Sequence, residues 1–193
     1  MSHAFFALIS RLKHITRWSL MRNSQPENVM EHSHMTAVLA HALAVIRRDV
    51  FHEPCNPGDA AAAALFHDAT EIFTGDMPTP VKYLNDEITS AYRAAENGAR
   101  ERLLSALPDE LRASYAPLLE SGADEETRKL VHAADKLSAY VKCLEEERAG
   151  NREFRLAAQQ TLIKLQALAM PEVDYFLAHC LPAFELTLDE LEI

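Results

Sequence analysis

Apolar residues recur along the chain every three or four positions, the spacing that places them on one face of an α-helix. One such stripe follows the turn-forming residues 23–26 and consists of positions 35/36, 39, 43, 46 and 50. A second stripe, in the C-terminal half, consists of positions 130, 134, 137, 141 and 144. The pattern predicts long helices that bury one face against each other.

Prolines, glycines and capping residues mark where the other helices begin and end. The predicted helices cover residues 3–15, 27–50, 60–73, 86–106, 109–120, 125–149, 151–168 and 172–180. Asp59 fits the N-cap of the third helix, and Gly75 fits its C-terminal stop. Residues 76–80 are expected to form an ordered loop, because two closely spaced prolines prevent a helix from continuing. No segment has the pattern of a strand.

The composition agrees with this helical pattern. Alanine, leucine and glutamate, which are good helix formers, dominate, and the 193 residues include only 5 glycines. The sequence contains no internal repeat, no low-complexity tract and no linker long enough to separate two domains. We therefore expect an all-α, single-domain protein that spans residues 1–193.

Charge and cysteine content argue against several classes of function. A formal net charge of −10 disfavours nonspecific binding to nucleic acid, which requires clustered lysine and arginine. Three scattered cysteines are too few for a disulfide framework or a thiolate zinc site. No apolar run approaches the ~20 residues of a membrane helix, and the N-terminus lacks the order of a signal peptide. We expect a cytoplasmic protein that binds neither nucleic acid nor a membrane.

The alanine-rich helix predicted over residues 60–73 carries ionisable groups that do not suit a buried helix. His67 and Asp68 are adjacent, and Glu71 follows on the same edge of the predicted helix. Burying an unpaired polar group costs roughly 2–7 kcal/mol, and an isolated charge costs far more. On its own, a His-Asp pair also fits a helix edge with a hydrogen-bonded histidine and an exposed aspartate.

Two other helices carry matching groups near their buried stripes. His32 lies one turn before Thr36, on the inward stripe of the predicted helix 27–50. Asp135 lies directly beside the stripe of the predicted helix 125–149, where small residues flank it. An acidic side chain on a largely buried helix requires a cation.

Together these residues form a candidate metal site from three helices, which consists of His32, His67, Asp68 and Asp135. Two imidazoles and two carboxylates suit one divalent transition metal ion, such as manganese, iron, cobalt, nickel or zinc. Four protein ligands around an octahedral ion leave two positions for water and substrate, which a catalytic metal requires.

This order of residues, H…HD…D on helices, resembles the HD-domain metal phosphohydrolases. Three longer stretches resemble more narrowly the bacterial 5′-deoxynucleotidases: RWSLMRNSQPENVMEHS, LFHDATEIFTGDMPTPVKY and ADKLSAYVKCLEE. The resemblance covers nearly the whole chain and implies an HD-type helical bundle with its metal-site region at about 28–145. It also implies a homodimer that hydrolyses deoxyribonucleoside 5′-monophosphates to deoxynucleoside and phosphate and prefers deoxyribose to ribose.

The resemblance assigns substrate-binding roles to residues on both sides of the metal site. Arg17 would orient the phosphate, since a guanidinium can hold two phosphate oxygens at once. Trp18, otherwise a core anchor, would line the sugar pocket and crowd a 2′-hydroxyl, a penalty of ~1–3 kcal/mol. The opposing wall would consist of Asp76, Met77, Pro78 and Thr79, which would serve equally as a helix-ending turn. His32, Asp68 and Asp135 would face the substrate as well as the metal.

Several alternatives remain open at this level. Glu71 is the candidate general acid or base, or else a carboxylate that holds His67 in position. Lys82 is a second candidate for phosphate binding, or else a solvated surface lysine. The acidic run at 145–147 is most simply a solvated face. The enzyme could also be an HD-domain hydrolase of nucleoside di- or triphosphates or of cyclic nucleotides, although only Arg17 is available for longer phosphate chains. A non-catalytic helical module with a structural metal is the remaining class.

Overall fold

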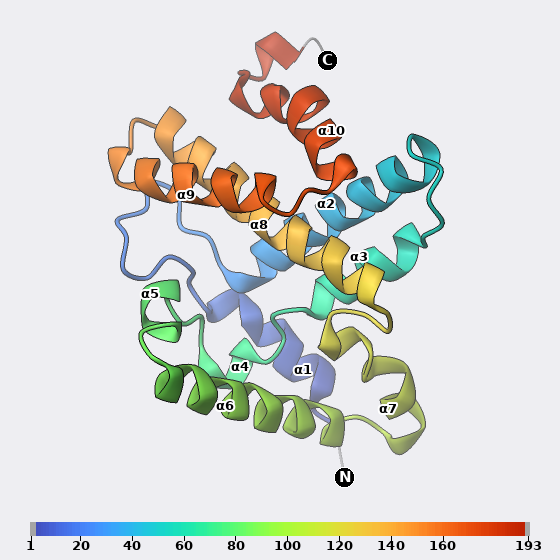
Figure 1. Cartoon of the computed structure of the whole chain (residues 1–193). Helices are drawn as coiled ribbons and strands as arrows, with labels where there is room; N and C mark the ends of the chain where they lie inside the picture. The colour runs from blue at the N-terminus through green and yellow to red at the C-terminus, as the bar shows by residue number, and fades with distance from the viewer. Residues whose placement is uncertain (1–2, 192–193) are drawn as a thin grey trace.

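Helices account for all regular secondary structure in residues 3–191, the part of the chain that the computed structural model describes (Figure 1). The α-helices are α1 (Phe5–Ile9), α2 (Val29–Asp49), α3 (Pro57–Phe66), α4 (Glu71–Thr74), α5 (Thr79–Lys82), α6 (Asp86–Ser105), α7 (Asp109–Tyr115), α8 (Glu125–Arg148), α9 (Arg155–Gln166) and α10 (Pro171–His179). Short 3-10 helices are η1 (Ser10–His14), η2 (Leu118–Glu120), η3 (Arg152–Phe154), η4 (Leu181–Glu185) and η5 (Asp189–Leu191). The prediction of an all-α fold is confirmed.

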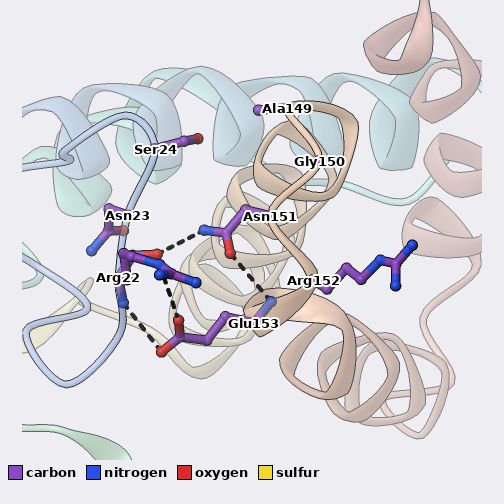
Figure 2. Close-up of a pocket in the computed structure, with 8 residues that line it drawn as sticks. All are labelled: Arg22, Asn23, Ser24, Ala149, Gly150, Asn151, Arg152 and Glu153. Atoms are coloured by element: carbon purple, nitrogen blue, oxygen red, sulfur yellow. Dashed lines mark hydrogen bonds and ion pairs between the residues drawn. The ribbon is translucent and has the colours of Figure 1, made fainter.

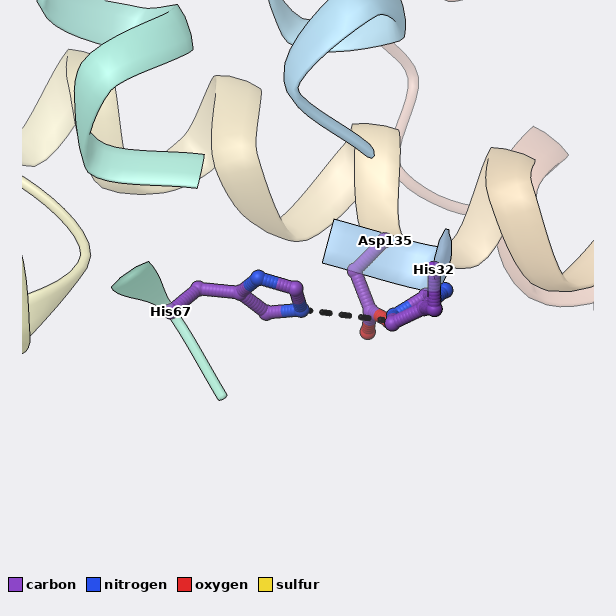
Figure 3. Close-up of side chains that lie close together, drawn as sticks. All are labelled: His32, His67 and Asp135. Atoms are coloured by element: carbon purple, nitrogen blue, oxygen red, sulfur yellow. Dashed lines mark hydrogen bonds and ion pairs between the residues drawn. The ribbon is translucent and has the colours of Figure 1, made fainter. Parts of the chain in front are cut away.

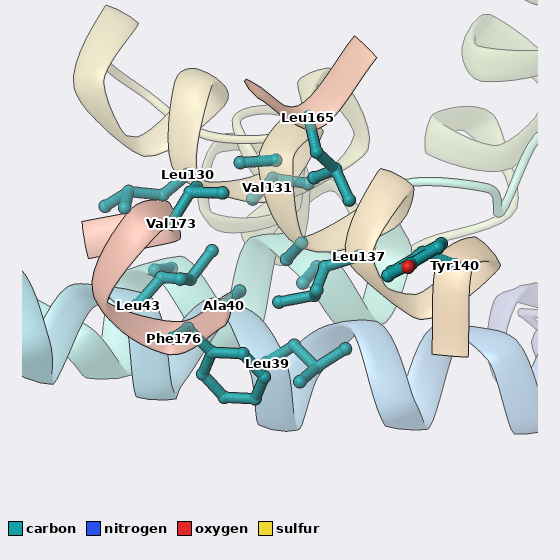
Figure 4. Packing of buried hydrophobic residues seen from close by; sticks show 14 of the residues in the cluster. Leu39, Ala40, Leu43, Leu130, Val131, Leu137, Tyr140, Leu165, Val173 and Phe176 are labelled. Carbon is teal, nitrogen blue, oxygen red and sulfur yellow. The ribbon is translucent and has the colours of Figure 1, made fainter. Parts of the chain in front are cut away.

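The two long helices α2 and α8 pack against each other at the centre of the fold, and α3 packs against both. Leu39 and Leu43 on α2 and Leu130 and Leu137 on α8 belong to the predicted stripes and are buried in one core (Figure 4). The prediction for position 50 is wrong, because Val50 lies past the end of α2 and is exposed. Helices α9 and α10 cover this core. A smaller second core lies between α1, α6 and the turn after α3, and consists of Phe5, Ala69, Leu103, Leu107 and Leu119.

Local capping explains where the central helices begin. The side chain of Asn28 accepts a hydrogen bond from the Glu31 amide while Glu31 bonds back to the Asn28 amide, a capping box that starts α2. The side chain of Asp124 accepts from the Thr127 amide and starts α8. None of the helices in residues 3–191 is both long enough and apolar enough to cross a membrane.

The predicted continuous helix over residues 60–73 is wrong. The helix begins earlier, at Asn56 as N-cap rather than Asp59, and it ends at Phe66. Residues 67–70 form tight turns, and α4 follows as a separate helix, so His67, Asp68 and Glu71 do not share one helical edge. The physical reason is a tertiary contact, because Ala69 is buried in the second core and draws the chain away from the axis of α3.

The loop prediction for residues 76–80 is correct only in its first part. Gly75 ends α4 with φ of 71°, a left-handed conformation that glycine adopts without strain. Residues 76–78 carry no helix, but Thr79 and Pro80 begin α5. A proline is tolerated there because the first turn of a helix needs no backbone N–H donor.

Glu146 is not part of a solvated face, contrary to the sequence-based prediction for 145–147. Its side chain is 1% exposed and accepts hydrogen bonds from the Ser24 amide at 2.8 Å, the Ser24 hydroxyl at 2.6 Å and the Gln25 amide at 3.1 Å. Lys142 pairs with it and also donates to the Gln25 carbonyl. Figure 2 shows the adjacent contact, in which Asn151 donates to the Arg22 carbonyl at 2.7 Å. The segment 22–25 is therefore fixed to the end of α8.

Replacing Glu146 by alanine should lower the free energy of unfolding by about 3–5 kcal/mol, because the ammonium of Lys142 would stay buried without a counter-charge. Burial would raise the pKa of Glu146, but the contacts with Lys142, Ser24 and Asn151 hold it well below its ordinary value of 4.5. The stabilisation is therefore present above pH 4.5 and is lost as the pH falls toward the lower folded-state pKa. Urea unfolding at pH 7 and pH 4 measures both effects. A variant that is as stable as the parent at pH 7 would contradict this account.

Candidate metal centre and substrate site

His32 is held at the centre of the site by α2 and α8. The capping box fixes the first turn of α2, and the imidazole that follows it is fully buried. Its Nδ1 lies 3.2 Å from the hydroxyl of Ser138 on α8. When Nδ1 donates to this hydroxyl, Nε2 presents a lone pair to the site.

His67 presents a lone pair in the same way. Its Nδ1 lies 2.7 Å from the carbonyl oxygen of Ala64, and because a carbonyl only accepts, Nδ1 carries the proton. In the neutral ring Nε2 is then an acceptor, and it is buried without a hydrogen-bond partner among the described residues. It nevertheless lies 3.1 Å from Asp68 Oδ2, a contact between an acceptor and a carboxylate.

The four predicted metal ligands converge, as Figure 3 shows for His32, His67 and Asp135. The Nε2 atom of His32 lies 3.1 Å from Asp135 Oδ1 and 3.5 Å from Asp68 Oδ2. The Nε2 atom of His67 lies 3.9 Å from Asp135 Oδ1. Ligand atoms of the three residues drawn all lie within 4.8 Å of one another. The turn after α3 thus brings Asp68 to the same point that α2 and α8 reach.

The electrostatics of this cluster fit a divalent cation. Burial would lower the pKa of His67, but the charges of Asp68 and Asp135 raise it to about 9. Burial would raise the pKa of Asp68 and Asp135, but the imidazoles lower both, that of Asp68 to about 2. Lone pairs and carboxylates that face each other in a buried site demand positive charge, and imidazole with carboxylate is the donor set of divalent transition metals.

Arg17 lies at the edge of this cluster. Its side chain is 11% exposed, its Nη1 lies 3.3 Å from Asp68 Oδ2, and its Nε lies 3.0 Å from Glu27 Oε2. Burial would lower the pKa of Arg17, but the charges of Asp68, Asp135 and Glu27 raise it. A permanent cation therefore stands beside the predicted metal ligands.

Trp18 is half-buried beside Arg17 and is not a central core anchor. Its Nε1 donates to Glu27 Oε2 at 3.1 Å, and its ring centroid lies 5.2 Å from that of Phe154. Its backbone adopts φ of 58°, an unusual conformation for a bulky residue. One edge of the indole is thus fixed by a hydrogen bond next to the cation.

The residues of the predicted opposing wall lie where α4 ends and α5 begins. Asp76 is half-buried, and although burial raises its pKa, the charge of Arg17 opposes the rise, which places this carboxyl within the field of the site. Met77 and Pro78 are half-buried in the segment between α4 and α5. Thr79 begins α5 with an exposed side chain. Contact of these residues with a substrate stays a prediction.

Glu71 is available for chemistry, whereas Lys82 is engaged elsewhere. Burial raises the pKa of Glu71, and the charges of Asp68 and Asp76 raise it further, to about 10. One of its carboxyl oxygens is buried and has no hydrogen-bond partner among the described residues. The ammonium of Lys82 pairs with Glu96 at 2.9 Å and lies over the ring of Tyr92, so this partly exposed lysine is paired with a carboxylate outside the metal cluster.

Sequence reasoning missed two residues of the site. Glu27 stands at the start of the predicted helix 27–50, ahead of its apolar stripe, and its contact with Arg17 depends on how the chain turns between them. Ser138 was visible only as a small residue one turn after Asp135 on α8. A search for hydrogen-bond partners of buried imidazoles along the same helix face would have found Ser138; no sequence signal marks Glu27.

Comparison with known proteins identifies the family and the fold. A family model described as "5′-deoxynucleotidase YfbR-like" matches residues 4–184. The 5′-deoxynucleotidase VP0926 of Vibrio parahaemolyticus is 48% identical over 188 residues, which cover 97% of each chain. Among solved structures, an HD-domain phosphohydrolase from Listeria innocua superimposes with a TM-score of 0.81 at 26% identity, over 98% of this chain and 92% of that one.

A more distant solved structure shares the fold. The HD phosphohydrolase DatZ of cyanophage S-2L, bound to dA and one catalytic Zn²⁺ ion, superimposes with a TM-score of 0.63 at 20% identity. The alignment covers 91% of this chain and 95% of that one. Because the family model spans almost the whole sequence and a relative at 48% identity covers 97% of it, the chain belongs to the YfbR-like family of 5′-deoxynucleotidases and has the HD-domain fold.

Proposed function

We propose that this 5′-deoxynucleotidase hydrolyses deoxyribonucleoside 5′-monophosphates at one divalent metal ion that His32, His67, Asp68 and Asp135 hold. The observation that carries the proposal is the convergence of these four side chains, with an arginine in contact with one of them. The donor set suits manganese, iron, cobalt, nickel or zinc. The catalytic Zn²⁺ ion of the DatZ structure supports a catalytic role for such an ion on this fold.

A bound divalent ion would supply Lewis acidity for hydrolysis of the phosphate ester. The role of Arg17 is to orient the phosphate, since its guanidinium lies against Asp68 and presents a planar set of donors that matches two phosphate oxygens. It is the residue that makes a dianionic group acceptable in an otherwise acidic cluster.

Glu71 acts as the proton carrier in this proposal. A carboxyl group whose pKa is raised holds a proton at neutral pH and can give it to a leaving 5′-oxygen. The alternative role, to hold His67 in position, has less support because the Nδ1 proton of that ring is already bonded to the Ala64 carbonyl. An unpartnered carboxyl oxygen beside the cluster is what a proton carrier requires.

The competing substrates are nucleoside di- and triphosphates and cyclic nucleotides. Longer phosphate chains need additional cations. Arg17 lies at the cluster, whereas Lys82 is already paired with Glu96, and this favours a monophosphate substrate. A phosphate-release panel over nucleoside mono-, di- and triphosphates and a cyclic nucleotide tests this choice. We expect release from 5′-monophosphates, and a preference for triphosphates would overturn the proposal.

Replacing Trp18 by alanine should reduce discrimination against ribose. If the indole crowds the 2′-hydroxyl, its removal relieves a penalty of ~1–3 kcal/mol and lowers the deoxy-to-ribo ratio of kcat/KM by about 5- to 150-fold. The ratio is measured with one deoxy- and one ribonucleoside monophosphate of the same base. Because both rates come from one preparation, differences in folding or metal content cancel in the ratio. Equal rates on both sugars in the parent protein would contradict this role.

We also propose that the protein is a cytoplasmic homodimer, as the family resemblance implies. Near the C-terminus Phe176 is buried in the core, whereas Leu186 and Leu188 are exposed. On α9, Leu156 and Ile163 are also exposed. Sedimentation of the purified protein tests the dimer, and a monomer at micromolar concentration would exclude it.

A further inference from the structure

We propose that Glu27 is a positioning residue that locks Arg17 and Trp18 onto one carboxylate oxygen, so that phosphate orientation and sugar discrimination depend on a single anchor. The inference rests on the proposed function, because that function gives the phosphate and the sugar to these two residues. Glu27 itself belongs to neither the metal cluster nor the predicted walls of the pocket.

The contacts of Glu27 converge on its Oε2 atom. This oxygen accepts from Arg17 Nε at 3.0 Å and from Trp18 Nε1 at 3.1 Å. The Glu27 side chain is 15% exposed, so these bonds are largely shielded from water. Because a carboxylate accepts strongly in a shielded setting, the two donors are held within hydrogen-bond reach of one atom.

The backbone brings the three residues together independently of these side chains. The Arg17 amide donates to the Glu27 carbonyl at 2.9 Å, and the Val29 amide donates to the Ile15 carbonyl at 3.0 Å. An isolated antiparallel bridge joins Thr16 and Asn28 between them. These backbone contacts fix the main chain of Glu27 opposite that of Arg17. The Glu27 side chain therefore lies within hydrogen-bond distance of both donors in the folded chain.

Trp18 has an unusual backbone conformation that its surroundings must hold in place. Its positive φ lies in a region that costs a bulky residue free energy and that persists only when its surroundings enforce it. The Met21 amide and the Asn23 side chain donate to its backbone carbonyl at 2.9 and 3.3 Å. These bonds fix the backbone, but the direction of the indole edge is set by the bond to Glu27.

Glu27 also helps to set the position of the Arg17 guanidinium beside the metal cluster. Arg17 bridges the two carboxylates, with Nε on Glu27 and Nη1 on Asp68. Without the carboxylate at position 27, the guanidinium would keep its contact with Asp68 but lose the bond that fixes its orientation. The carboxylate of Glu27 thus keeps the guanidinium at the edge of the cluster, where a phosphate can meet it.

The test compares Glu27→Ala and Glu27→Gln with Glu145→Ala, a matched control. Glu145 lines the same cavity as Glu27 but lies on α8 and carries an exposed side chain. For Glu27→Ala we expect kcat/KM on a deoxynucleoside monophosphate to fall about 30- to 100-fold, the effect of a misplaced positioning group. The deoxy-to-ribo ratio should fall as well, while metal content stays that of the parent. Glu27→Gln, which keeps an acceptor oxygen, should restore part of both losses, and Glu145→Ala should match the parent.

The single tryptophan gives a second readout that needs no substrate. Loss of the Nε1 hydrogen bond in Glu27→Ala should shift the Trp18 emission and make it easier to quench with acrylamide, with an intermediate result for Glu27→Gln. Parent-like emission and an unchanged deoxy-to-ribo ratio in both variants would overturn the inference, even if stability falls. A parent protein that releases no phosphate from deoxynucleotides would overturn the proposed function instead, and the emission data would still decide the contact.

Discussion

The Asp135→Asn protein should purify folded, with far less than one metal ion per chain, and should lose about 10³-fold or more in kcat on a deoxyribonucleoside monophosphate. The substitution is nearly isosteric but removes one of the two negative charges that neutralise a divalent ion. It also replaces the carboxylate oxygen that lies 3.1 Å from His32 Nε2. Several kcal/mol of electrostatic stabilisation depend on the ion, which corresponds to a rate effect of this size.

Metal analysis and phosphate release on the same preparation measure this effect. Asp174→Asn is the matched control, because Asp174 is an exposed aspartate in the first turn of α10, a helix that carries none of the predicted metal ligands. The control should keep both metal and rate. An Asp135→Asn protein with one ion per chain and the rate of the parent would exclude Asp135 as a ligand.

Glu71→Gln should keep its metal and lose about 10²- to 10⁴-fold in kcat, the range expected when a general acid or base is removed. The amide matches the carboxyl in size but cannot transfer the proton. Because the pKa of Glu71 is raised, its acid form persists at neutral pH, and the parent rate should decline as rising pH removes that proton. The decline should be absent in the variant.

Glu71→Ala separates the two roles considered for this residue. If Glu71 carries the proton, the alanine variant keeps its metal and lacks turnover. If metal and activity disappear together, Glu71 supports the site structurally and its proposed catalytic role is wrong. Metal analysis alongside a pH–rate profile distinguishes these outcomes.

The buried stripes of the two central helices were predictable from sequence, and with them His32 and Asp135. Helical periodicity places both near an inward face, and the structure confirms the stripes at Leu39 and Leu137. The all-α fold followed from the same pattern. These features depend on local repetition of residue type, which a single sequence displays directly.

The path of the chain between the helices was not predictable in the same way. The break at residues 67–70 arises because Ala69 enters the second core, a contact with residues more than thirty positions away. The burial of Glu146 depends on the Ser24 segment, and the role of Glu27 depends on a turn that returns the chain to Arg17. Each is a tertiary contact that no local pattern encodes.

Dependence of hydrolysis on a single divalent ion is tested most directly by removing the metal from the parent protein and restoring it stepwise. Phosphate release from a deoxyribonucleoside 5′-monophosphate is followed while manganese, cobalt or zinc is titrated into the metal-free protein. We expect no release without metal and a rise in rate that saturates at one ion per chain. Full activity in the metal-free protein would exclude a catalytic metal at this site.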